Sequence, residues 1–462
     1  MKKRTKGFLI AGICIIGVAL LSAIPIVLLS GALVQDTFDS IVKSELFTGL
    51  PMMTGKEVTY TVPEDVGGDN ELLWVRNSTK EEYESYLKLL EKQGYVKHSD
   101  NGEDGIEGYV YTSNFQKGDL LVAVSYYPRI KETSIELCAE DVFSDHLIYN
   151  DSYVEDNIPG FSTKFIMPEL YSAGNSFVIQ LKNGHFIVND GGTLENIFYL
   201  FDLLDSLSPN GQKPVIDAWI VSHSHSDHMD VLRALTKRPE LAERVAVEGV
   251  YFTPACDAAN EERRGTVAMM AYTMSVKTAR LTLRDSYGEP TAMYRMREGE
   301  RYYFSDITMD VLFALDILNY KEWKTSNAQS TILMYTIDEQ KVLIPADADY
   351  ECQKKMLEIF DDAYFDLAVY QLPHHGGNTY NEITKHFTYK TLLNAGRSFS
   401  TAASSLLSRL EQQQYAISKS EEHMAWGEGG VVLTFPYTVG TYERLPMVDW
   451  ESYQTDIDTL MN

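Results

Sequence analysis

The sequence predicts an α/β fold, because strand-like and helical segments alternate along most of its 462 residues. Between about 158 and 440, apolar runs such as 215–221 alternate with amphipathic segments such as 194–207. A long apolar segment at 7–34 and a smaller region at 67–150 precede this part. The alternation predicts an α/β or layered αββα domain of roughly 300 residues, with helices outside the sheets.

The apolar segment 7–34 contains no charged side chain. The hydrocarbon core of a bilayer requires about 20 apolar residues in a helix, so this segment can span it. A basic cluster at 2–6 precedes it and predicts a cytoplasmic N-terminus. We therefore expect 1–34 to form a single-pass anchor in the lipid bilayer of the cell membrane, with the remainder extracytoplasmic. A cleaved signal peptide is the alternative, although its apolar core is usually shorter, about 7–15 residues.

The charge balance of the chain limits the classes of ligand that it can bind. Asp and Glu number 66 against 40 Lys and Arg, which gives a net charge of −26. So acidic a surface argues against a basic groove for nucleic acid, and a phosphate substrate would need metal ions as its positive partner. The four cysteines form neither a disulfide framework nor a Cys-x-x-Cys metal site.

Residues 35–66 are predicted as a linker with one strand near 56–62, and 67–150 as a small α+β module without catalytic signals. In the module, Ser78 and Glu81 fit a capping box at the start of a helix. Strands are expected at 109–115, 119–127 and 133–138 of the module, and at 176–182, 185–189, 308–314, 330–337, 341–346, 366–372 and 430–435. Further helices are expected at 228–237 and near 401–413.

The strongest chemical signal is the segment 222–228, which reads Ser-His-Ser-His-Ser-Asp-His at the end of an apolar strand. In an extended turn, His223 and His225 point the same way and can share one metal ion. Asp227 and His228 start the next helix and can face a second metal. Imidazole together with carboxylate suits zinc, with manganese or iron as alternatives. A polar loop with unrelated histidines is the competing interpretation.

This segment resembles the H-x-H-x-D-H signature of the metallo-β-lactamase superfamily, an αββα sandwich with one or two metals at one edge. The resemblance implies that fold for 158–440 and leaves 441–462 as a C-terminal tail. Upstream, the hairpin-like 175–179 and the Asp-Gly-Gly at 190–192 resemble the family's opening motif. The resemblance implies that Asp190 orients the metal loop and does not bind metal.

Two downstream strand ends resemble the family's remaining ligand motifs. A strand ending in Asp347 resembles the bridging aspartate, and the Pro-His-His-Gly-Gly at 373–377 resembles the last motif. The resemblance implies His223, His225 and Asp347 on the first metal, and Asp227, His228, Asp347 and one of the paired histidines on the second. Strand phase favours His375 as that ligand and His374 as a contact to substrate, and the reverse assignment stays open.

Paired histidines before glycine are typical of the metallo-hydrolase domain of ComEC-type DNA-uptake proteins. Asn327 and Ser330 match an Asn and a Ser of that branch, and the resemblance suggests them as substrate contacts. The chain departs from the superfamily because no histidine lies between His228 and Asp347. The branch's terminal His-Pro motif is not evident, and His423 is a candidate replacement, with an ordinary loop histidine as the alternative.

The resemblance implies a metal-dependent hydrolase of phosphoester bonds, and the expected anchor at 7–34 makes it a membrane-anchored, extracytoplasmic one. Two divalent cations, zinc or else manganese, would share a hydroxide that attacks the ester. Asp227 is expected to orient the nucleophile, Asp190 to support the metal loop, and His374, Asn327 or Ser330 to stabilise the developing oxyanion.

An envelope phosphodiester fits the expected location, whereas the acidic charge disfavours nucleic acid. The sequence does not predict any protein partner. The alternative function is a non-catalytic, membrane-anchored binding or sensor protein on a hydrolase scaffold. The nearly complete ligand set argues against it, since such a scaffold would be expected to lose several ligands.

Overall fold

The computed structural model describes residues 50–51, 53, 56–61, 70–138, 156–171, 174–253, 278–314, 326–376, 386, 388–394, 421–424 and 429–461. Within these ranges, no helix is long and apolar enough to cross a membrane. The expected anchor at 7–34 and the expected helix near 401–413 lie outside the described residues.

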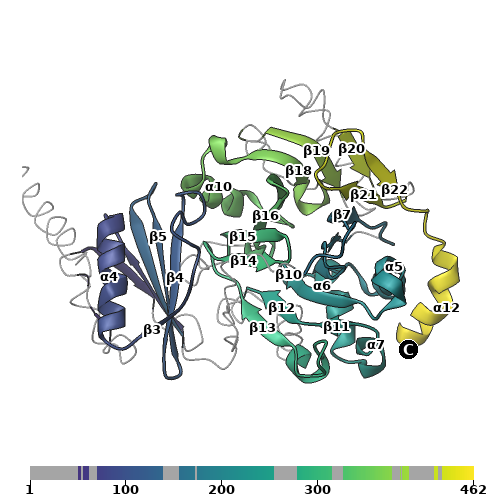
Figure 1. The fold of residues 1–462 in the computed structure, drawn as a ribbon, viewed down its shortest axis with the longest axis horizontal. Helices are drawn as coiled ribbons and strands as arrows, with labels where there is room; N and C mark the ends of the chain where they lie inside the picture. Colours follow the sequence, from purple (N-terminus) through teal and green to yellow (C-terminus); the bar gives the residue numbers. More distant parts are fainter. Residues whose placement is uncertain are drawn as a thin grey trace, which may run out of the picture.

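The N-terminal module is an antiparallel sheet covered on one face by helix α4 (Lys80–Lys92), seen at the left of Figure 1. The helix packs Tyr83, Tyr86 and Leu90 against sheet residues that include Leu73 and Ile135. The sheet order is β1 (Val58–Thr61), β2 (Asn70–Val75), β6 (Glu132–Cys138), β5 (Leu120–Tyr127), β4 (Tyr111–Lys117) and β3 (Val96–Asp100). The strand near 56–62, expected in the linker, is therefore part of this sheet.

The capping box of α4 lies one residue later than expected. The Thr79 hydroxyl accepts a hydrogen bond from the Glu82 backbone N–H at 3.3 Å, and the Glu82 carboxylate accepts one from the Thr79 N–H at 2.9 Å. Ser78 is buried and accepts a hydrogen bond from the Thr133 hydroxyl at 2.8 Å. The prediction of Ser78 and Glu81 was wrong because Ser78 faces the neighbouring strand β6.

Two larger sheets form the rest of the described chain. The first has the order β13 (Ala292–Arg295), β12 (Gly249–Phe252), β10 (Val215–Val221), β9 (Phe186–Asp190), β8 (Ser176–Gln180), β7 (Lys164–Met167), β21 (Val431–Thr434) and β22 (Tyr442–Arg444), and β11 (Ala246–Val247) also pairs with β10. The second has the order β14 (Arg301–Phe304), β15 (Ile307–Phe313), β16 (Ile332–Ile337), β17 (Gln340–Ile344), β18 (Asp366–Gln371), β19 (Thr388–Asn394) and β20 (Glu421–Met424).

Helices cover the outer faces of both sheets, as the layered prediction requires. The described helices are α5 (Ile197–Leu207), α6 (Ser226–Leu235), α7 (Pro239–Ala242), α10 (Tyr350–Ile359) and α12 (Trp450–Met461), with short 3-10 turns η2 (Leu194–Asn196), η3 (Pro209–Gly211), η4 (Ser326–Gln329), η5 (Asp362–Tyr364) and η6 (Pro373–Gly376). Side chains of α5 and α6 pack on the first sheet, and α10 packs on the second. One buried core, which includes Phe177 and Tyr335, lies between the sheets. The prediction of a mixed α/β fold is confirmed.

Several elements were not expected from the sequence. Strands β12, β13 and β14 lie in a stretch without a predicted element, and α6 begins two residues before the expected 228. Residues 441–462, expected as a tail, contribute β22 to the first sheet and α12, which packs beside α5. The strands β12, β13 and β14 have only four residues each, which is too short for a periodic signal.

The module docks on the two-sheet domain through buried polar contacts. The Asn101 side chain donates to the Gly299 carbonyl at 2.8 Å, and the Asn114 side chain donates to the Glu300 carboxylate at 3.1 Å. Beside these contacts, one sheet face of the module and residues 295–298 line a small hollow. The module is therefore held by specific contacts to the connection between β13 and β14 of the larger domain.

Gly299 allows this close approach. Its φ is +91°, and a Cβ there would lie 2.4 Å from the Thr112 hydroxyl and 2.5 Å from a Val110 methyl. We expect Gly299→Ala to lower the free energy of unfolding by about 2–4 kcal/mol, since the left-handed backbone and the overpacked contact both oppose alanine. Urea titration measures this value.

Gly102→Ala is the matched control, because Gly102 has φ +85° and nothing within 4 Å of the added Cβ. It should lose only the backbone contribution, about 1 kcal/mol. Equal losses in the two variants would contradict a role for Gly299 in docking.

Candidate metal centre

The candidate ligands gather where strands of both large sheets end. Strands β9 and β10 are parallel neighbours in the first sheet, and β17 and β18 are parallel neighbours in the second. Parallel neighbours bring their carboxyl ends to one edge, so the loop after each strand reaches a shared site. The loop after β10 carries the histidine cluster, and the loops after β17 and β18 carry Asp347 and the paired histidines.

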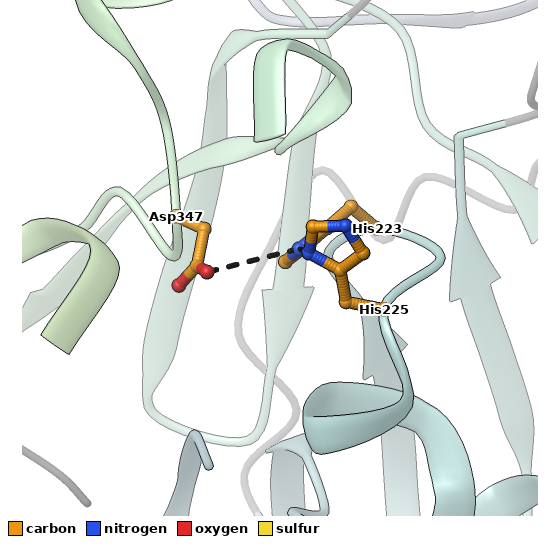
Figure 2. Close-up of side chains that lie close together, drawn as sticks. All are labelled: His223, His225 and Asp347. Carbon is orange, nitrogen blue, oxygen red and sulfur yellow. Dashed lines mark hydrogen bonds and ion pairs between the residues drawn. The ribbon is translucent and has the colours of Figure 1, made fainter. Parts of the chain in front are cut away.

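The first ligand group contains His223, His225 and Asp347, whose candidate ligand atoms all lie within 4.8 Å of one another. Figure 2 shows the carboxylate of Asp347 facing the imidazole of His223, with the Nε2 and Oδ2 atoms 3.9 Å apart. The Nε2 atom of His223 also lies 3.0 Å from Nδ1 of His225. Two imidazoles and one carboxylate thus point at a common position.

The second group contains Asp227, His228 and His375, again within 4.8 Å of one another. The Nε2 atom of His375 lies 3.3 Å from Oδ2 of Asp227, and Nε2 of His228 lies 3.8 Å from the same oxygen. Helix α6 places Asp227 and His228 because it begins directly after His225, whose carbonyl accepts the backbone N–H of His228.

Asp347 belongs to the first group and also lies beside the second. Its Oδ2 atom faces His223 at 3.9 Å, whereas its Oδ1 atom lies 3.2 Å from His228 Nε2 and 3.6 Å from His375 Nε2. One carboxylate oxygen therefore faces each group, which is the geometry that a carboxylate shared by two cations requires.

Burial and charge set the protonation states of these groups. Burial lowers the pKa of His223 and His225, which favours the neutral imidazole that binds metal. Burial alone would raise the pKa of Asp347, but His228 and His375 outweigh it and hold this pKa well below its usual range. Burial opposes a charge on His228, yet Asp347 and Asp190 raise its pKa well above the ordinary value.

The donor set fits a pair of divalent cations. His228 Nε2 and Asp347 Oδ1 are both buried, and neither makes a hydrogen bond within the described part of the chain, although they lie 3.2 Å apart. Buried polar atoms without hydrogen bonds are costly unless another group satisfies them. Imidazole nitrogens and carboxylate oxygens in these two groups suit zinc or manganese.

Asp190 supports the histidine loop from behind, as the resemblance implies. Its Oδ2 atom lies 2.8 Å from His228 Nδ1, and its Oδ1 atom accepts the Ser222 backbone N–H at 2.8 Å. The Ser222 hydroxyl and the Asn175 side chain also donate to this carboxylate, at 2.9 and 3.3 Å. Ser222 and Asn175 lie in segments that the sequence marks, but their contacts to Asp190 are not predicted because these contacts join separate segments of the chain.

We expect Asp190→Asn to weaken metal affinity about 10–100-fold, because a partner that orients a ligating histidine contributes about that much. Chelator competition measures the affinity. Asp217→Asn is the control, since Asp217 lies 2.7 Å from His185 in an Asp–His pair outside both ligand groups. Unchanged metal affinity in the Asp190 variant would contradict a role for Asp190 in orienting His228.

The residues expected to contact substrate differ in their exposure and in their distance from the ligand groups. His374 is partly exposed, lies 3.9 Å from Asp347, and contacts the Asn327 amide at 3.2 Å. Ser330 is fully buried, and its hydroxyl makes no hydrogen bond to a described residue. The His423 backbone lies on β20 opposite Leu393, and its side chain is outside the described residues.

No protein-family model and no curated protein matches this chain. Among solved structures, it is similar to the metallo-beta-lactamase fold protein YhfI from Bacillus subtilis, with 12% identity, a TM-score of 0.36, and coverage of 59% of this chain and 100% of that chain. It is also similar to Igni18, a metallo hydrolase from the archaeon Ignicoccus hospitalis, with 12% identity, a TM-score of 0.35, and coverage of 60% of this chain and 100% of that chain. A third similar structure is Zn²⁺-bound PqqB from Methylobacterium extorquens, with 10% identity, a TM-score of 0.29, and coverage of 45% of this chain and 71% of that chain.

Proposed function

We propose that this chain is a metal-dependent hydrolase of phosphoester bonds, related to the metallo-β-lactamase superfamily and anchored to the cell membrane by residues 7–34. The observation that carries the proposal is Asp347, whose two oxygens face two separate groups of ligands. A single cation would need only one of these groups. The arrangement therefore supports two cations held side by side.

When bound, a pair of divalent cations supplies an activated water and neutralises charge that develops on the substrate. The chain's own residues hold this pair and shape the approach to it. Burial raises the pKa of Asp227, but a hydrogen bond from His375 and the charge of His228 outweigh burial and hold this pKa well below its ordinary value. The carboxylate of Asp227 therefore stays ionised. The ionised Asp227 carboxylate would help to hold the second cation and would accept a hydrogen bond from a water beside it, which orients that water.

The more exposed side chains mark the side from which a substrate can enter. Asp227 and His374 are 27% and 24% exposed, whereas His223, His228, His375 and Asp347 are at most 2% exposed. The Asn327 amide holds the ring of His374 next to the Asp347 carboxylate. His374 is therefore placed to donate a hydrogen bond to substrate oxygen or to the leaving group.

A phosphoester is the substrate class that this site suits best. Its negative charge matches paired cations, and the chain offers no compensating excess of basic residues, with a net charge of −26. The same charge opposes long nucleic acid, whose binding depends on many Lys and Arg contacts. A small envelope phosphodiester fits an extracytoplasmic location.

The test combines metal analysis of the purified full chain with turnover of bis-p-nitrophenyl phosphate and a panel of carboxylic esters. We expect two divalent ions per chain and phosphodiester turnover that chelators abolish and added zinc or manganese restores. Tight metal binding without turnover of any ester would overturn the hydrolase proposal and favour a sensor. Turnover of carboxylic esters alone would overturn the phosphoester assignment.

A further inference from the structure

We infer that Gln371 is a positioning residue that fixes the two strand-end loops of the metal centre relative to each other. The inference rests on the proposed function, because it assigns a residue to the same site. Gln371 is the last residue of β18 and is 1% exposed. Its side chain forms hydrogen bonds with the backbone of Ala346 and Leu372, which lie next to the loops that carry the ligands.

The Gln371 amide satisfies both polar groups of one residue in the neighbouring loop. Its Oε1 atom accepts the Ala346 backbone N–H at 2.8 Å, and its Nε2 atom donates to the Ala346 carbonyl at 3.0 Å. The same Nε2 atom donates to the Leu372 carbonyl at 3.0 Å. One side chain thus joins the residue before Asp347 to the start of the histidine loop.

The backbone at this junction requires such a partner. Ala346 has φ +48°, and His374 and His375 both have φ +50°, in the left-handed region that residues other than glycine rarely adopt. Ala346 is fully buried and lies beyond the end of β17, so its N–H and C=O are outside the strand pairing. The surrounding contacts must hold this disfavoured conformation.

A second contact runs between the same loops. The His374 backbone N–H donates to the Ala346 carbonyl at 3.0 Å, so this carbonyl accepts hydrogen bonds from both His374 and Gln371. Movement of the Ala346 peptide would therefore shift the carboxylate of Asp347 and the ring of His375 together. Ligands must lie within a few tenths of an ångström of their ideal positions, so this junction controls metal affinity.

The test is the affinity of the full chain for Zn²⁺ alone, measured by chelator competition on metal-free protein. Gln371→Met keeps a flexible side chain of similar size and removes all three hydrogen bonds. We expect it to weaken Zn²⁺ affinity about 10–100-fold, as loss of a supporting contact to a metal ligand does. The Co²⁺ absorption spectrum should change as well, because it reports coordination geometry.

Gln180→Met is the matched control. Gln180 is also buried and donates to a single backbone carbonyl, that of Leu207 at 2.7 Å, outside the metal loops. Both variants should lower the melting temperature of the metal-free protein, but only the Gln371 variant should lower Zn²⁺ affinity. A merely structural role for Gln371 would lower both melting temperatures and leave both affinities unchanged.

Gln371→Glu is a second variant in case the methionine variant does not fold. It keeps an acceptor for the Ala346 N–H but places an oxygen against two carbonyl oxygens, so weaker Zn²⁺ binding is expected. Wild-type affinity and an unchanged Co²⁺ spectrum in a folded Gln371 variant would overturn the inference alone. A wild-type chain that binds no divalent metal would overturn both the inference and the proposed function.

Discussion

Asp347→Asn should remove at least one metal ion per chain and lower phosphodiester turnover about 10³-fold. The carboxylate lies between the two ligand groups, with Oδ1 3.2 Å from His228 and Oδ2 3.9 Å from His223. An amide keeps the shape of the side chain but loses the charge and one acceptor oxygen. Shared metal charge stabilises a transition state by several kcal/mol, which corresponds to this loss of rate. Metal stoichiometry and steady-state turnover measure the result.

Asp349→Asn is the control for this substitution. Asp349 caps α10 by accepting the Glu351 backbone N–H, and asparagine caps helices equally well. The control should keep its metal and its turnover. If Asp347→Asn kept two metal ions and wild-type turnover, the assignment of Asp347 as the shared ligand would be wrong.

Glu136→Ala should lower the free energy of unfolding by about 3–5 kcal/mol, the usual cost of removing one partner of a buried ion pair. Glu136 on β6 of the module is 13% exposed and pairs with Arg297 at 2.8 Å and with Arg295. Without it, two largely buried guanidinium groups of the larger domain lose their shared carboxylate. Urea unfolding measures the change, and Glu91→Ala on the exposed face of α4 is the control.

This contribution should depend on pH. Burial alone would raise the pKa of Glu136, but Arg295 and Arg297 outweigh it and hold the pKa below its ordinary value of 4.5. A carboxyl with a lowered pKa stabilises the fold above its ordinary pKa, and this stabilisation is lost as the pH falls through the lowered value. The stability difference between wild type and Glu136→Ala should therefore shrink below about pH 4.5. A difference that stayed constant down to pH 3 would contradict the ion-pair account.

The candidate site was predictable because its signals are local in sequence. Four ligand-type side chains lie within 223–228, and the other candidates directly follow recognisable apolar strands. The structure places Asp347 and His375 beside this segment, and the strand-phase preference for His375 agrees with its place in the second group. The histidine cluster is visible in the sequence itself, whereas Asp347 and His375 are predicted from the family resemblance together with their positions at strand ends.

The supporting contacts were not predictable from local patterns. Gln371 acts on Ala346, 25 positions earlier, and Asn101 of the module contacts Gly299, 198 positions later. Neither amide stands out in its own segment. Such roles depend on which loops the completed sheets bring together, and periodicity contains no information about that.

The most direct test of a shared two-cation centre is the number and position of metal ions in crystals of the full chain, located by anomalous scattering. We predict two ions, one bound by His223, His225 and Asp347 and the other by Asp227, His228, His375 and Asp347. Crystals grown with excess zinc or manganese that showed no ion between these residues, or a single ion bound without Asp347, would contradict this account.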